Sequence, residues 1–197
     1  MNEFLEFQSK WQLMSMEEKM RIAMQTDSYN NQGALTYKSG DIQKAIEYFK
    51  KALAIMPIND DTLSNLIICY KHNEDYYKIP LLWAKLYQIN HNQILKEKII
   101  AFSLLSDIIG NYESEYDSGI AYLSNLLETI KDNYNINVSE SEVFSIHNKI
   151  NESYNRDIIT YGNMRFMFMT SPEKIYKSTN NVPRSLLKEA RKDIINW

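Results

Sequence analysis

Cysteine, proline and glycine are all scarce in this chain of 197 residues, which contains one Cys, four Pro and five Gly. The single cysteine, Cys69, excludes an intrachain disulfide and a zinc site built from several thiolates. The low Pro and Gly content and the 44% of hydrophobic residues argue against a long disordered tail. The composition therefore predicts one soluble globular domain, 1–197, with a substantial core.

Clustered positive charge and long apolar runs are missing as well. The net charge of −3 argues against general nucleic-acid binding. No stretch of 18 residues is both apolar and uncharged, so we expect no membrane span. The first residues include acidic side chains and no long apolar run, which argues against a signal peptide. We therefore expect a cytoplasmic protein.

The sequence also lacks the motifs that bind phosphate or carry catalysis, such as GxxxxGK[ST], GxGxxG, GxSxG and HExxH. Its three histidines, His72, His91 and His147, fall in separate segments and are interpreted as surface residues. Cys69 lies within an apolar helical pattern, which predicts a small buried side chain. We therefore expect no cofactor, no metal and no enzymatic activity. The alternative is a catalytic pocket assembled late in the chain from four side chains: His147, Tyr154, Arg156 and Arg165.

What the sequence does contain is helical periodicity, most clearly between Tyr29 and Asn59. Gly40-Asp41 separates two segments that each repeat apolar residues at intervals of three and four, the pattern of amphipathic helices. The second segment ends before Pro57, which cannot continue a helix. Small residues let two antiparallel helices approach closely, and with larger residues of both copies some of them are predicted to be buried: Gly33, Ala45, Leu53, Leu66, Trp83 and Leu86.

A shift of 34 residues maps this helical hairpin onto a second copy, in which Phe49 corresponds to Trp83. A third copy keeps its first helix near Ile100, after which an enlarged turn delays the next stripe. The hairpin and its 34-residue offset resemble the tetratricopeptide repeat (TPR), a helix–turn–helix unit. The resemblance covers 26–92 and, in degenerate form, extends to about 131. It implies an all-α solenoid of stacked helix pairs.

In the TPR family the first helix of each repeat lines a concave face that binds peptides or proteins. The resemblance therefore implies a partner-binding surface in this chain. Its expected members, transferred position by position, are Asn30, Tyr37, Lys38, Asn65, Ile68, Lys71, His72, Lys98 and Phe102. Amides can bond a peptide backbone, lysines can meet a carboxylate, and aromatic rings supply apolar contact.

Segments outside the repeats are predicted to be capping helices. Residues 1–25 form one helix or two, with a possible restart at a capping box of Ser15 and Glu18. Residues 132–197 form a C-terminal helical cap in which a second capping box, Ser139 with Glu142, opens a helix whose stripe continues to Tyr161. The run 164–169 either finishes that helix or forms a buried connector. Ser171-Pro172 and Val182-Pro183 are each predicted to open a further helix.

The predicted function is a non-catalytic interaction module of the adaptor or chaperone type, which binds a peptide or protein on its concave face. A dedicated inhibitor, such as an immunity protein that blocks one folded toxin, fits the same features. A homo-oligomer formed through the terminal helices, 1–25 or 183–197, is a further alternative.

Overall fold

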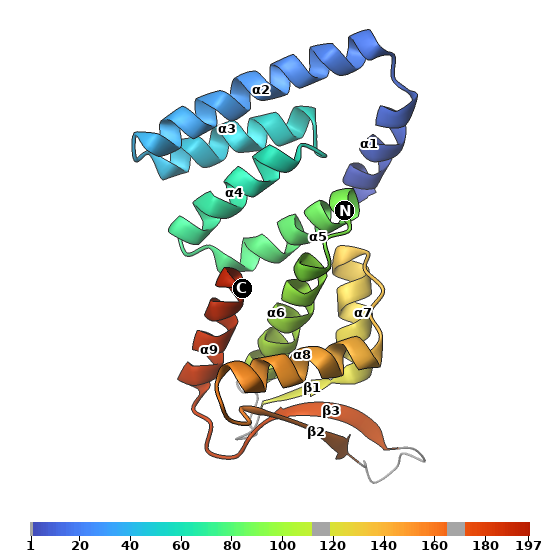
Figure 1. Ribbon diagram of the computed structural model, residues 1–197, viewed down its shortest axis with the longest axis vertical. Helices are drawn as coiled ribbons and strands as arrows, with labels where there is room; N and C mark the ends of the chain where they lie inside the picture. The colour runs from blue at the N-terminus through green and yellow to red at the C-terminus, as the bar shows by residue number, and fades with distance from the viewer. Residues whose placement is uncertain (1, 112–118, 165–171) are drawn as a thin grey trace. The chain divides into compact units, whose positions relative to one another are not determined.

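The computed structural model describes residues 2–111, 119–164 and 172–197, and these residues divide into two compact units, 1–92 and 93–197. The sequence predicts one domain with internal boundaries near 25 and 131. Helices dominate both units (Figure 1). Among the described residues, no helix is long and apolar enough to cross a membrane.

Unit 1 is built from helices alone in its described part. They are α1 (Asn2–Leu13), α2 (Met16–Lys38), α3 (Ile42–Ile55), α4 (Asp60–His72), the short 3-10 helix η1 (Tyr76–Lys78) and α5 (Ile79–Asn90). From α2 to α5, each helix packs on the next one in the chain. The two predicted helix pairs, α2–α3 and α4–α5, are therefore confirmed.

The α2–α3 hairpin forms where the sequence places its turn and its small residues. Gly40 adopts a left-handed conformation with φ 89°, and the Asp41 side chain caps α3 by accepting a bond from the Lys44 N–H. Gly33 lies so close to the Phe49 ring that an added Cβ would be only 2.6 Å from Cε1. The other residues predicted to be buried are buried too, apart from Leu53, which is half-buried.

The capping box of Ser15 and Glu18 is present and separates α1 from α2, so the leading segment is two helices. Helix α1 contacts α5 and also meets the start of α2, where the Lys19 Nζ lies 5.8 Å from the centroid of the Trp11 ring. The buried Phe4 ring lies beneath the Lys85 Nζ, and Gln8 Nε2 donates a hydrogen bond to the Gln88 carbonyl at 3.3 Å.

Unit 2 surrounds one central helix, α6 (Gln93–Asn111), which packs against the sheet and the unit's other α-helices. Those helices are α7 (Leu123–Tyr134), α8 (Glu140–Ser153) and α9 (Arg184–Asp193), and the short 3-10 helix η2 (Ile194–Asn196) follows. Helix α6 is buried around most of its circumference. Its run of apolar residues from Ile99 to Ile109 explains this, because a helix that is hydrophobic all round belongs inside a core.

Unit 2 also contains a three-stranded antiparallel sheet, in the order β1 (Ile120–Tyr122), β3 (Glu173–Ser178), β2 (Ile159–Met164). Tyr176 at its centre lies opposite Ala121 on one side and Tyr161 on the other. The predicted all-α class is therefore right for most of the chain and wrong for this sheet.

Two helix predictions fail where the strands occur. The stripe assigned to one helix up to Tyr161 splits, because α8 ends at Ser153 and β2 begins at Ile159. No helix follows Pro172, since Glu173–Ser178 is β3. The apolar run 164–169 lies almost wholly outside the described residues. The capping box of Ser139 and Glu142 and the last helix after Pro183 are confirmed.

Candidate functional site

Several of the expected partner-binding residues meet along the junction of α2 and α4 in unit 1. The Asn30 Oδ1 accepts hydrogen bonds from the Thr62 hydroxyl at 3.1 Å and from Asn65 Nδ2 at 3.0 Å. Two turns further on, the Tyr37 and His72 rings meet edge to face with their centroids 6.1 Å apart. Because all three contacts join residues 32 to 35 positions apart, the two helices run side by side in the same direction.

We call this surface the α2–α4 face, and define it by Asn30, Tyr37, Lys38, Asn65, Ile68, Lys71 and His72. The close packing of Gly33 on the Phe49 ring determines where the α2–α4 face lies, because it fixes which side of α2 packs against α3. Thr62 was not among the expected residues. Its position, 32 residues after Asn30 and near the start of α4, is the sequence signal that could have indicated it.

The amide pair at the centre of the α2–α4 face is only partly satisfied. Both lone pairs of Asn30 Oδ1 are used, whereas Asn30 Nδ2 and Asn65 Oδ1 have no hydrogen-bond partner among the described residues. The half-buried pair thus offers the amide nitrogen of Asn30 as a donor group and the amide oxygen of Asn65 as an acceptor. An extended residue of a peptide, whose own N–H and C=O point to the same side, has the complementary requirement.

Positive charge lies at the end of the face formed by the last turns of α2 and α4. Lys38 and Lys71 belong to those turns, and neither forms an ion pair within the described part of the chain. Partial burial lowers the pKa of the Lys71 ammonium, because desolvation disfavours the charged form. The exposed Ile68 adds an apolar contact, with 47% of its surface accessible. An acidic or carboxylate-bearing group suits this end.

Two expected members of the surface lie elsewhere. Lys98 and Phe102 belong to α6 in unit 2, where they are 9% and 4% exposed, and the Arg191 guanidinium covers the Phe102 ring. Neither side chain is accessible to a partner in this structure, so the interpretation of these two residues as binding residues is corrected. The 34-residue repeat that predicts these two positions does not extend beyond Asn90, because the next helix, α6, forms the core of unit 2.

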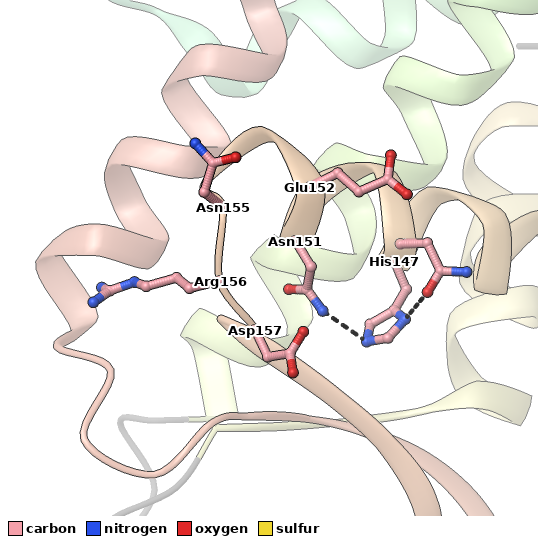
Figure 2. Close-up of a pocket in the computed structure, with 7 residues that line it drawn as sticks. His147, Asn151, Glu152, Asn155, Arg156 and Asp157 are labelled. Atoms are coloured by element: carbon pink, nitrogen blue, oxygen red, sulfur yellow. Dashed lines mark hydrogen bonds between the residues drawn. The ribbon is translucent and has the colours of Figure 1, made fainter.

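The alternative site late in the chain is a shallow pocket of about 580 Å³ between the end of α8 and the start of β2 (Figure 2). Its lining is polar and consists of His147, Asn148, Asn151, Glu152, Asn155, Arg156 and Asp157. His147 is 8% exposed, so its interpretation as a surface histidine is wrong.

Hydrogen bonds explain why His147 and Asn151 are buried. The Asn151 Oδ1 accepts from the Ile158 and Ile159 N–H groups at 2.9 and 3.1 Å, and its Nδ2 donates to the Ile159 carbonyl at 2.8 Å. The His147 Nε2 lies 2.9 Å from the same carbonyl oxygen. Both side chains therefore stabilise the turn from α8 into β2. They bond backbone groups at the start of β2 that a neighbouring strand would otherwise bond.

The other residues of the alternative site do not converge on His147. The Tyr154 hydroxyl donates to the Asp193 carboxylate of α9, and burial, together with this hydrogen bond, raises the pKa of the phenol. The Arg156 side chain points away from His147 in Figure 2, and Arg165 lies outside the described residues. Within the described ranges, no three His, Cys, Asp or Glu side chains gather closely enough to hold a metal ion.

The one cysteine is buried in α4, as predicted, and desolvation raises the pKa of its thiol to about 11.

Comparison with known proteins adds no assignment, because no family model matches the chain and no curated protein is similar enough to count as a match. The resemblance to the TPR family therefore remains a prediction from the sequence.

Proposed function

We propose that unit 1 is a protein-binding module of the adaptor or chaperone type, which holds an extended peptide segment of its partner along the α2–α4 face. The observation that carries this proposal is the Asn30–Asn65 pair, which is half-buried and leaves the Asn30 amide nitrogen and the Asn65 amide oxygen without a partner among the described residues. The N–H and C=O of one extended residue point to the same side of the chain, so a single residue of the partner could bond both groups and be fixed in position.

Side chains beyond the amide pair supply the rest of the recognition. Tyr37 and Ile68 offer apolar contact, and Lys38 and Lys71 offer cations to an acidic residue or a chain terminus. A short segment loses conformational freedom on binding, and this entropy cost offsets much of the contact energy. We therefore expect a dissociation constant on the order of micromolar.

A dedicated inhibitor of a folded protein is the second candidate function, and the exposed methionines of α2 favour it. Met16, Met20 and Met24 are 75%, 55% and 73% exposed. Met20 and Met24 line a hollow of about 820 Å³ together with Glu17 and Glu18. Flexible methionine side chains adapt to irregular surfaces, so this region would extend a contact beyond the length of a short peptide.

Copurification from the native host followed by mass spectrometry identifies the partner, and titration then separates the two functions. A peptide-binding module should bind a synthetic segment of the partner about as well as it binds the whole partner. An inhibitor should bind only the folded partner and should tolerate changes on the α2–α4 face.

Matched variants test the face itself. The double change Tyr37→Ala and Lys71→Glu should weaken binding at least tenfold, because it removes an apolar contact and reverses a charge. The control is Lys44→Glu, which makes the same charge change at an exposed position on α3. Equal affinities for the double variant and the control would rule out the α2–α4 face as the binding surface.

A further inference from the structure

The small sheet of unit 2 has two outer strands, and they differ in how their open edges are covered. Strand β1 has only three residues, and the Asn111 side chain of α6 donates a hydrogen bond to the Ile120 carbonyl on its outer side. Strand β2 has six residues and pairs only with β3 among the described strands. An uncovered edge can pair with another strand, so the outer side of β2 is the one to consider.

The register of the sheet shows which backbone groups of β2 point outward. The Thr179 N–H donates to the Ile158 carbonyl, so Ile158 and every second residue after it bond to the β3 side. Ile159, Tyr161 and Asn163 therefore present their N–H and C=O groups on the outer side. At Ile159 these groups are already satisfied by the Asn151 side chain.

At Tyr161 and Asn163 the outward backbone groups have no hydrogen-bond partner within the described ranges. The usual protection of an edge is missing as well, because β2 contains no charged residue and no proline. The open stretch is short, since Asn151 closes it at Ile159. It therefore presents two donors and two acceptors of the backbone.

We propose that this edge pairs with the same edge of a second copy of the chain, so that unit 2 forms a symmetric dimer through β2. In the antiparallel register centred on Gly162, Tyr161 of one copy lies opposite Asn163 of the other. Both copies then use both open residues, which gives four N–H···O bonds related by a two-fold axis. A register shifted toward Ile159 would meet groups that Asn151 already occupies.

The residue at the two-fold axis suits this arrangement. Gly162 would face Gly162 of the other copy in a pair without direct hydrogen bonds, where the Cα atoms approach to about 4.5 Å. Beside the edge, the Phe144 side chain is 43% exposed and its ring lies 5.7 Å from the Tyr161 ring. A second copy seated on β2 would cover part of this apolar surface. The two β2 strands would thus provide the polar pairing, and Phe144 of α8 would add apolar contact beside it.

Opposite charges at the axis provide the test. An added Cβ at Gly162 meets no atom within 4 Å, so Gly162→Asp and Gly162→Lys should both fold. Each would place two like charges opposite one another, which destabilises a strand pair. Gly110→Asp is the matched control, because that glycine also has open space and carries the same charge change at an exposed site in α6.

Sedimentation measures the mass of the full chain from about 1 to about 500 µM, a range chosen because a small contact binds weakly. We expect the native chain and Gly110→Asp to shift from 23.3 kDa toward twice that mass. Gly162→Asp and Gly162→Lys should each stay at the monomer mass, and an equal mixture of the two should dimerise again. The proposal is overturned if the native chain stays monomeric, if its dimer survives Gly162→Asp, or if the mixture stays monomeric.

A cysteine at the same position gives a second readout. In Gly162→Cys the two thiols would lie within disulfide distance across the axis, and the one native cysteine, Cys69, is buried. Mild oxidation should convert this variant to a covalent dimer, whereas Gly110→Cys should remain mostly monomeric under the same conditions. Equal cross-linking of the two variants would contradict the two-fold contact at Gly162.

Discussion

Replacing Gly33 by alanine has one stabilising and one destabilising effect, both of known size. The net change in stability therefore tests how closely α2 packs on α3. Alanine favours a helix over glycine by about 1 kcal/mol. The new Cβ would lie 2.6 Å from the Phe49 ring, and the ring is 1% exposed, with little room to move. Overpacking of this kind costs about 1–3 kcal/mol. We expect a net loss of roughly 0–2 kcal/mol in unfolding free energy, measured by hydrogen exchange of the α3 amides.

A second substitution separates the two effects. Phe49→Ala alone should cost about 3–5 kcal/mol, because it leaves a cavity. In that background the clash is gone, so Gly33→Ala should stabilise the unit by about 0.5–1 kcal/mol through helix propensity. Gly110→Ala, where the added Cβ meets no atom within 4 Å, controls for propensity alone. If Gly33→Ala stabilised the native chain, the close helix contact would be wrong.

Two further predictions concern unit 2. Burial raises the pKa of the Asp107 carboxyl from 3.8 to about 6, so the folded state holds this proton more tightly and stability falls as the pH rises from about 4 to about 6. Asp107→Asn should therefore raise the unfolding free energy by roughly 1–2 kcal/mol at pH 7.5, a figure reduced for solvent screening, and by little at pH 4. Urea unfolding at the two pH values measures this difference. An equal gain at both pH values would contradict burial of the carboxyl as the cause. Asn151→Ala should destabilise the unit by roughly 2–4 kcal/mol, because it leaves the Ile158 and Ile159 amides unsatisfied. Glu152→Ala on the exposed side of α8 should change little, and comparable thermal melting of the two variants would refute the role of Asn151.

The fold of unit 1 follows from local sequence signals, and this is why it could be predicted. The Ser15 capping box, the Gly40-Asp41 turn and the small residue Gly33 each act through neighbours in the chain or through the adjoining helix. The meeting of Asn30 with Asn65 also follows, because a fixed offset of 34 residues places equivalent positions of parallel helices side by side.

Unit 2 was less predictable because its strands depend on contacts between distant segments. Ile158 and Tyr161 continue the helical spacing of α8, and short apolar runs do not distinguish a helix from a buried strand. The helix ends because Asn155 adopts a left-handed conformation, with φ 51°, and because the Asn151 side chain bonds the backbone of β2. Nothing in the periodicity indicates that bond.

The site could be predicted only where the repeat period holds. The offset fails after α5, where His91 in a left-handed conformation, with φ 52°, ends the helix and α6 begins within two residues. Helix α6 then becomes the core of its own unit, which buries Lys98 and Phe102. Its continuous apolar run was the available signal, since a helix that lines a groove keeps one polar side.

The most direct test of the proposed binding face follows the side-chain amide signals of Asn30 and Asn65 by nuclear magnetic resonance while the copurified partner, or its peptide, is added. Asn31, exposed on α2 next to Asn30, is the internal control. We predict that the signals of Asn30 and Asn65 move and saturate together with binding, while that of Asn31 stays in place. Binding that leaves both signals unchanged would contradict the central claim that the partner lies along the α2–α4 face.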